Sequence, residues 1–212
     1  MAQEPILPPI EPCRWIGTPD PRVLEILFPD VTYSFYPVYA HGTGVPYRTI
    51  PLKSDYSIDV EGLKSPNSGV IFPNPNAPTG LGLELSDVER IIRQNPDSVV
   101  IVDEAYIDFG GESATPLIAE HPNLLVVQTL SKSRSLAGLR VGWAMGDRGL
   151  IDALERVRDS VNSYTVDRVA QVGAAAAIRD EAYFQETNRR AMATRDRFSA
   201  GLNKLGFSVV PP

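Results

Sequence analysis

The 212-residue chain is long enough for one or two domains, and 43% apolar residues can bury a sizeable core. Its 20 basic and 26 acidic side chains give a net charge of −6, which argues against nucleic-acid or membrane partners and favours small-molecule chemistry. A single cysteine, Cys13, excludes a disulfide scaffold. The first residues resemble no secretion signal and no apolar run could cross a bilayer, so we expect a soluble, cytoplasmic protein.

Prolines dominate the first thirty residues, and each removes a backbone donor and disfavours helix before it. We therefore expect extended, loosely held chain there. Strand-forming side chains follow at 47–52 and at 69–72, each closed by a proline or Asn-Pro turn signal. A loop or short helix is expected between these two strands.

The middle of the chain alternates helical and strand patterns. Ser86 and Glu89 fit a capping box, and the apolar residues around them repeat at helical spacing, which predicts a helix to about Asn95. Residues 98–103 form a continuous β-branched run that is typical of a strand covered on both faces in a parallel sheet. Residues 124–129 look similar, so the pattern predicts a layered α/β sheet.

A third run of this kind covers 139–145, and helical patterns then take over. The first of these helices follows a cap at Asp147, and an Ala-rich one covers 167–178. The last covers 184–205, and Gly206 directly after it ends the helix. Residues 207–210 again favour a strand.

Polar clusters follow the predicted strands at the places where ligands of open parallel sheets bind. They are Asp103 to Tyr106, Ser131 with Lys132, Arg140, and the Pro-Asn-rich turn at 73–80. Each has an ordinary alternative, because an Asp often caps a turn, Pro and Asn build rigid turns, and most lysines are solvated. Their convergence at one sheet edge is what predicts a site.

Lys132 stands between an apolar strand and a serine-rich stretch that also holds Arg134. We expect partial burial and the nearby cations Arg134 and Arg140 to favour a nucleophilic amine. For Arg134 itself two roles are open: a second contact to a phosphate, or a solvated surface charge. Glu104 and Glu112 are expected to be local hydrogen-bond partners.

The joint pattern resembles the large domain of fold-type I pyridoxal-phosphate aminotransferases, and within them the histidinol-phosphate aminotransferases. Four strings carry the resemblance: PDVTYSFYPVYA at 29–40, FPNPNAPTG at 72–80, VVIVDEAYIDFGGES at 99–113 and TLSKSRSLAGLRVGWAMG at 129–146. With the matching helices it covers about residues 28–210.

The resemblance implies three catalytic residues. Lys132 would bind the cofactor pyridoxal 5′-phosphate covalently and move a proton between the substrate and the cofactor. Asp103 would pair with the ring nitrogen of the cofactor. Tyr106 would donate a hydrogen bond to the phenolic oxygen of the ring.

The resemblance also implies further cofactor contacts. Ser131 and Arg140 would hold the phosphate, for which a guanidinium is a well-matched donor. Tyr33 would stack on the ring, although neighbouring aromatic residues make an ordinary core role an alternative. Many relatives carry Asn directly before Pro-Thr-Gly, where this chain has Ala77. Asn76 is the substitute we predict, with Asn74 or no side chain at all as alternatives.

The fold implied is a three-layer α/β/α large domain with a mainly parallel sheet over 28–180, preceded by an irregular segment over 1–27 and followed by the start of an incomplete small domain over 181–212. The Gly-rich phosphate loop and the substrate-binding arginine of the family have no counterpart that we find, so the chain resembles a cofactor-holding core shortened at both ends.

The reaction implied is transfer of an amino group from histidinol phosphate to 2-oxoglutarate, giving imidazole acetol phosphate and glutamate, in a homodimer without nucleic-acid or membrane partners. No metal is expected, because His41 and His121 are the only histidines and are far apart in the sequence. We expect both to be surface or loop residues.

Alternatives remain at this stage. An aromatic-amino-acid aminotransferase or a phospho-amino-acid decarboxylase would use the same Asp, Tyr, Lys and Arg. A P-loop nucleotide hydrolase also places acidic residues after a β-branched run, but the sequence has no G-x-x-x-x-G-K-[ST] motif. A catalytically incomplete fragment or a non-catalytic remnant is the third class.

Overall fold

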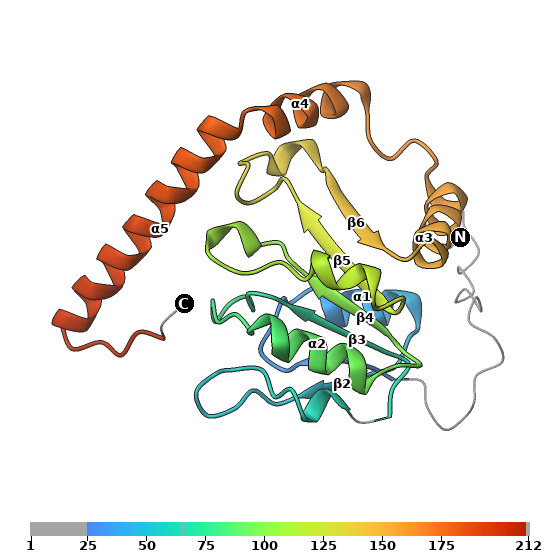
Figure 1. Ribbon diagram of the computed structural model, residues 1–212, viewed down its shortest axis with the longest axis horizontal. Coiled ribbons are helices and arrows are strands. Elements are labelled where there is room, and N and C mark those ends of the chain that lie inside the picture. The colour runs from blue at the N-terminus through green and yellow to red at the C-terminus, as the bar shows by residue number, and fades with distance from the viewer. Residues whose placement is uncertain (1–24, 65, 211–212) are drawn as a thin grey trace, which may run out of the picture.

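One sheet gathers strands from along most of the chain (Figure 1), in a computed structural model that describes residues 25–64 and 66–210. Its strands are β1 (Ile26–Pro29), β2 (Tyr47–Ile50), β3 (Gly69–Pro73), β4 (Val99–Asp103), β5 (Leu124–Thr129) and β6 (Gly142–Gly146), in the spatial order β2-β1-β3-β4-β5-β6. The α-helices are α1 (Tyr36–Thr43), α2 (Leu85–Gln94), α3 (Arg148–Val161), α4 (Arg168–Arg179) and α5 (Glu181–Lys204). Short 3₁₀ turns are η1 (Gly62–Lys64), η2 (Ile107–Phe109), η3 (Thr115–Ala119) and η4 (Ala137–Leu139).

The sheet is mainly parallel, as predicted. Strands β1 to β5 pair in parallel, whereas β6 runs antiparallel to β5. The prediction for 139–145 is therefore wrong in its start and in its direction, because Leu139 belongs to η4 and the strand begins at Gly142. The connection from β5 to β6 holds only the short η4, without the helix that usually returns a chain to begin a parallel strand.

Strand β1 corrects the expectation of loosely held chain. It lies between β2 and β3, and Leu27 and Phe28 are fully buried. Pro29 is the last residue of β1, so it does not interrupt the pairing of the strand. Burial of the apolar side chains before it stabilises the strand. The rest of the proline-rich segment, residues 1–24, lies outside the described residues.

Helices cover both faces of the sheet, which gives the three layers predicted. Leu27 and Phe72 share one buried cluster with Ile91 of α2. Phe28, the next residue along β1, points to the opposite face because side chains alternate along a strand. There its ring meets Tyr36 of α1 edge-on, with ring centroids 5.8 Å apart.

Helix α2 confirms the predicted helix but not its predicted start. Its N-cap residue is Glu84, so Ser86 lies inside the first turn and no side chain caps the helix. The predicted capping box is therefore wrong. Burial of Val88, Ile91 and Ile92 against the sheet holds the helix instead, since each fully buried aliphatic side chain contributes about 1.5–3 kcal/mol.

The three C-terminal helices are confirmed, with the aspartates Asp147, Asp167 and Asp180 accepting hydrogen bonds from backbone amides at their N-termini. Gly206 has a φ of 87°, as its predicted place after α5 requires. Residues 207–210 form no strand, because no sheet edge pairs with them. No helix in the described ranges has the length and apolarity of a membrane span.

Phe72 is fully buried at the centre of the sheet, and its replacement by alanine should lower the free energy of unfolding by about 3–5 kcal/mol. Urea denaturation followed by circular dichroism would measure this loss. The control is Phe198→Ala on α5, where the ring is mostly exposed and the expected change is below about 0.5 kcal/mol. Equal losses for both variants would contradict this packing.

Candidate active site

Strand direction explains why the predicted site residues meet at one edge of the sheet. The parallel strands β3, β4 and β5 end at this edge, and Pro73 of β3 pairs with Asp103 of β4. Because β6 is antiparallel, its beginning lies at the same edge, with Gly142 opposite Thr129. Arg140, two residues earlier, is thereby brought to the strand ends that carry the other polar groups.

Asp103 is half-buried at the end of β4, and both its carboxylate oxygens accept hydrogen bonds. The Ala105 amide donates to Oδ1 at 3.1 Å and the Tyr36 hydroxyl donates to Oδ2 at 2.8 Å. Burial, together with the charge of Asp103, raises the pKa of Tyr36 well above its ordinary value. Tyr36 thus stays protonated and holds the carboxylate in place, a contact that the sequence prediction missed.

Lys132 and Tyr106 come together above the ends of β4 and β5. The Lys132 ammonium lies 4.9 Å from the centroid of the Tyr106 ring, within the range of a cation–π contact. Lys132 is exposed, so the predicted partial burial is wrong. The reason is that it stands at the tip of a loop which continues past the strand end.

Aromatic and basic groups flank Asp103 on the other side. Tyr33 is 41% exposed, and its ring meets that of Tyr36 edge-on at 5.5 Å, so one part of Tyr33 packs while another faces solvent. Partial burial and Tyr33 raise the pKa of Tyr39, and the charge of Arg140 acts in the opposite direction. Arg140 therefore stands within electrostatic reach of this aromatic group.

Ser131 and Arg140 differ in burial and in their hydrogen-bond partners. Ser131 is half-buried, and its Oγ accepts a hydrogen bond from the Thr129 hydroxyl at 3.0 Å. Arg140 is exposed and donates through Nη1 to the Ala137 carbonyl at 2.9 Å. The backbone of Arg140 is left-handed, with φ 55°, just before β6.

Asn76 makes its hydrogen bonds within the protein. Its Nδ2 donates to the Val31 carbonyl at 3.0 Å and to the Thr79 hydroxyl at 3.3 Å, while its Oδ1 accepts from Thr32 at 3.0 Å. The residue is 1% exposed, and both amide hydrogens are used. Asn76 locks the 73–80 turn to the chain after β1 and has no donor left for a bound group.

Glu104 is fully buried and serves as a hydrogen-bond partner, as predicted. It accepts from the Ser113 hydroxyl at 2.7 Å, the Ala114 amide at 2.6 Å and the Gln128 side chain at 2.7 Å. These contacts join β4 to β5 and to the segment after η2. They leave Glu104 no free face toward the site.

A cavity of about 750 Å³ adjoins the site. It lies between the turn at 75–84 and the segment at 106–112, and Arg195 of α5 lines it as well. The cavity shares Asn76 and Tyr106 with the predicted site, but Asp103 and Lys132 lie outside its lining. Arg195 ties α5 to η2 by donating to the Phe109 carbonyl at 3.0 Å.

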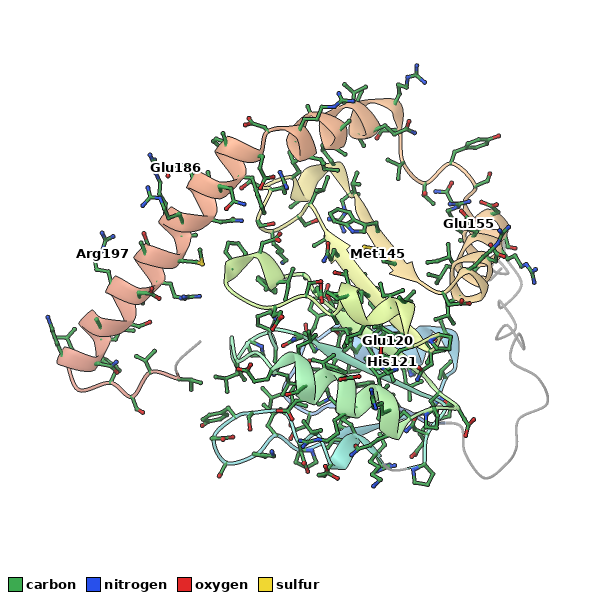
Figure 2. The ribbon with its side chains drawn as sticks, in the orientation of Figure 1. Glu120, His121, Met145, Glu155, Glu186 and Arg197 are labelled. Carbon is green, nitrogen blue, oxygen red and sulfur yellow. The ribbon has the colours of Figure 1, made fainter. Side chains whose placement is uncertain are left out.

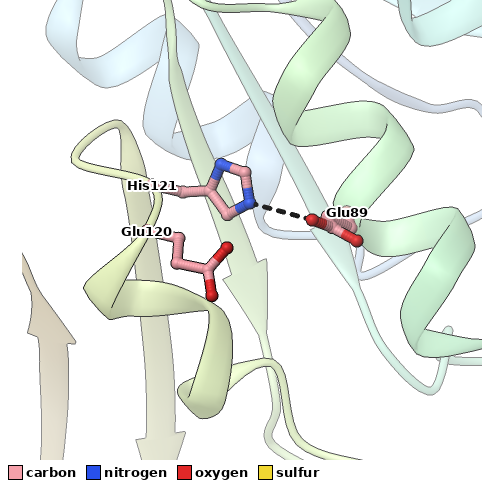
Figure 3. Close-up of side chains that lie close together, drawn as sticks. All are labelled: Glu89, Glu120 and His121. Atoms are coloured by element: carbon pink, nitrogen blue, oxygen red, sulfur yellow. Dashed lines mark hydrogen bonds and ion pairs between the residues drawn. The ribbon is translucent and has the colours of Figure 1, made fainter.

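A second group of polar side chains lies away from this edge (Figure 3). His121, in the turn before β5, has its Nε2 3.3 Å from Oε1 of Glu89 on α2, and Glu120 lies beside them. Of the two predicted settings, surface or loop, His121 has the second: it lies in the loop before β5, and only 9% of it is exposed. The His121–Glu89 pair therefore joins α2 to the turn before β5 and stabilises the packing of the helix against that turn.

Acid should weaken this junction. Hydrogen bonds from Arg93 and then His121 lower the pKa of Glu89 below its ordinary value. Between the ordinary and the lowered pKa the unfolded chain binds more protons than the folded protein, so stability is lost as the pH falls through that range. Urea midpoints from about pH 6 to about pH 3 should fall less steeply for Glu89→Gln than for the wild type. Glu61→Gln is the control, and identical slopes for all three proteins would refute this role.

The fold and the site together define an α/β protein that places a lysine, an aspartate, a tyrosine and an arginine at the carboxyl edge of a mainly parallel sheet. Residues 21–212 match the family described as aminotransferase class I and II, and the chain belongs to that family. The resemblance drawn from the sequence motifs is thereby confirmed at the level of the family.

Individual relatives point in the same direction. The chain is 58% identical over 189 residues to histidinol-phosphate aminotransferase 1 of Bordetella parapertussis, covering 88% of this chain and 53% of that protein. It is 57% identical over 188 residues to the Pseudomonas aeruginosa protein of the same name, covering 89% and 54%. The chain thus spans about half the length of these curated relatives.

A solved structure shares the fold. The histidinol-phosphate aminotransferase from Clostridium acetobutylicum superposes with a TM-score of 0.80 at 25% identity, covering 87% of this chain and 57% of that one. The predicted fold class is confirmed by this likeness and by the mainly parallel sheet.

Proposed function

We propose that this chain carries the catalytic core of a pyridoxal-phosphate-dependent aminotransferase acting on histidinol phosphate, with 2-oxoglutarate as the amino-group acceptor. The observation that carries the proposal is the convergence of Asp103, Tyr106, Lys132 and Arg140 at one sheet edge. The identity of 58% to a histidinol-phosphate aminotransferase supports the choice of substrate.

The described residues fit pyridoxal phosphate. The exposed part of the Tyr33 ring offers an apolar surface for a planar ring, and the Asp103 carboxylate keeps lone pairs free for a ring N–H. Arg140 and Ser131 offer donors to a phosphate, and Lys132 offers an exposed amine. Tyr106 has no hydrogen bond to its hydroxyl among the described contacts, so it remains available to a phenolic oxygen.

When bound, the cofactor supplies an aldehyde for amine exchange and an aromatic system that accepts electrons from the substrate. Lys132 would hold the cofactor through its Nζ, and the same amine would accept and return the proton of the substrate α-carbon. Asp103, held by Tyr36, would keep the ring nitrogen protonated through its negative charge. Arg140 and Ser131 would hold the phosphate and so restrict where the cofactor can lie.

The domain division, the oligomeric state and the cellular location are also proposals. A large domain over 28–180 and the beginning of a small domain over 181–212 correspond to the sheet with its helices and to α5. We propose a homodimer in the cytoplasm, supported by apolar side chains that α3 leaves exposed, among them Val157 and Val161.

The function is tested by turnover. The purified chain is incubated with pyridoxal phosphate, histidinol phosphate and 2-oxoglutarate, and the formation of glutamate is followed by mass spectrometry. Phenylalanine and phosphoserine serve as competing amines, and release of carbon dioxide is monitored in parallel. Glutamate formed fastest from histidinol phosphate supports the proposal. A preference for phenylalanine, decarboxylation or no reaction would reject it in favour of the corresponding alternative.

A further inference from the structure

Arg134 lies two residues after Lys132 and is anchored at the junction of α4 and α5. Its Cζ is 3.6 Å from the centroid of the Phe184 ring, and its Nη1 donates to the Ala177 carbonyl at 2.6 Å. Its Nη2 lies 3.4 Å from Oε2 of Glu181. With 14% of its side chain exposed, Arg134 is not a solvated charge, and its guanidinium is already bound on three sides.

The chemistry of these contacts suits an arginine and no other cation. Ala177 belongs to the last turn of α4, where carbonyl groups lack partners within the helix and carry partial negative charge. The planar guanidinium stacks on Phe184 while its N–H groups bond in the same plane, which a lysine ammonium cannot do. The anchor therefore depends on shape as well as on charge.

The lysine loop has a second anchor on its other side. The Ser133 hydroxyl donates a short hydrogen bond to Asp108 of η2, and Ser133 is almost completely buried. The Leu136 amide bonds to the Leu130 carbonyl at 2.9 Å and closes the loop. Lys132 is exposed and adjoins Ser133, so the position of these anchors sets where its amine can reach.

We propose that Arg134 is a positioning residue for Lys132, which holds the lysine loop against the α4–α5 junction so that the amine stays over Tyr106. The inference rests on the proposed function, because attachment of the cofactor is what gives the position of Lys132 its importance. It also makes the loop sensitive to the placement of α5, which starts at the predicted boundary of the small domain.

The test compares four variants of the full chain. Arg134→Met removes the stack and the charge, Arg134→Lys keeps the charge, and Phe184→Leu keeps Arg134 but removes the ring. Arg197→Met is the matched control, because Arg197 is exposed on α5 and points away from the sheet in Figure 2. Circular dichroism checks that each variant is folded.

The first readout is the labelling of Lys132 by pyridoxal phosphate, fixed with borohydride and mapped by mass spectrometry relative to Lys53. We expect Arg134→Met to lower this ratio about tenfold, Arg134→Lys and Phe184→Leu about threefold, and Arg197→Met not at all. The second readout needs no cofactor: it is the rate at which acetic anhydride acetylates Lys132 relative to Lys53. This ratio should differ from the wild-type value most in Arg134→Met, less in Arg134→Lys and Phe184→Leu, and not in Arg197→Met.

An unchanged acetylation ratio in folded Arg134→Met would overturn the proposal. If that variant does not fold, the decision falls to Phe184→Leu, which retains the Ala177 contact, and an unchanged ratio there overturns it as well. If the wild type fails to label at Lys132 with the cofactor but the acetylation ratios follow the expected order, the proposed function fails while the positioning role of Arg134 stands.

Discussion

Replacement of Lys132 by alanine is expected to abolish covalent retention of pyridoxal phosphate and to lower transamination by about three orders of magnitude or more. The physical reason is that Lys132 is the lysine whose amine lies over Tyr106 at the site; the other lysines of the chain are Lys53, Lys64 and Lys204. Lys132 is exposed, so the free energy of unfolding should change by less than about 0.5 kcal/mol. Absorbance of the reconstituted protein and glutamate formation measure the two effects.

Lys53→Ala is the matched control for this variant. Lys53 follows β2, which also ends at this edge of the sheet but lies at the far end of the strand order from the β5 and β6 pair. It should retain full activity and the full cofactor band. A Lys132→Ala protein that still transaminates, or a Lys53→Ala protein that does not, would assign the cofactor to another place in the molecule.

Asp103→Asn should reduce turnover by about 10²–10³-fold, because an amide cannot supply the negative charge that keeps the cofactor nitrogen protonated. The cofactor should still bind through Lys132 and Arg140, so the loss falls on the rate of turnover and less on the retention of the cofactor. Steady-state kinetics and the absorbance of the bound cofactor separate these two quantities.

Tyr36→Phe tests the support of Asp103 without touching its charge. Removal of the hydroxyl leaves the Asp103 Oδ2 without its donor at 2.8 Å, and a loss of about tenfold in turnover is expected. The ring stays in the core against Phe28, so the fold should persist. A Tyr36→Phe loss as large as that of Asp103→Asn would contradict the view that Tyr36 acts only through the carboxylate.

Much of the fold could be predicted because its patterns are local. The β-branched runs at 99–103 and 124–129 and the aspartate caps at Asp147 and Asp167 correspond closely to the structure. Strand direction is not local: a run of apolar residues looks the same in a parallel and an antiparallel strand, so β6 was predicted with the wrong direction. Strand β1 was missed because its burial depends on β2 and β3, which come later in the chain.

The site was predictable to the extent that a parallel sheet brings the strand ends together. That argument placed Asp103 and Lys132 at one edge without any knowledge of side-chain packing. It could not reveal the contact between Tyr36 and Asp103, which are 67 residues apart and meet only because α1 packs on the sheet. Nor could it place the Arg134 guanidinium, whose partners lie in two helices much further along the chain.

Asn76 has contacts that the sequence could not reveal. The resemblance suggested a contact with the cofactor, whereas in the structure Val31 and Thr79 accept from both amide hydrogens and the Thr32 hydroxyl donates to Oδ1. Buried amides are satisfied by whatever polar groups are nearest in the fold. A motif in the sequence cannot say which groups those will be.

Attachment of pyridoxal phosphate to Lys132, at the sheet edge that holds Asp103 and Tyr106, is the event on which the other proposed roles depend. Reduction of the chain with borohydride in the presence of pyridoxal phosphate, followed by mass spectrometry, maps the label among its four lysines. We expect label at Lys132 well above the level at Lys53, Lys64 and Lys204. Label spread evenly over the four lysines, as in a denatured control, would show that this edge of the sheet does not select Lys132.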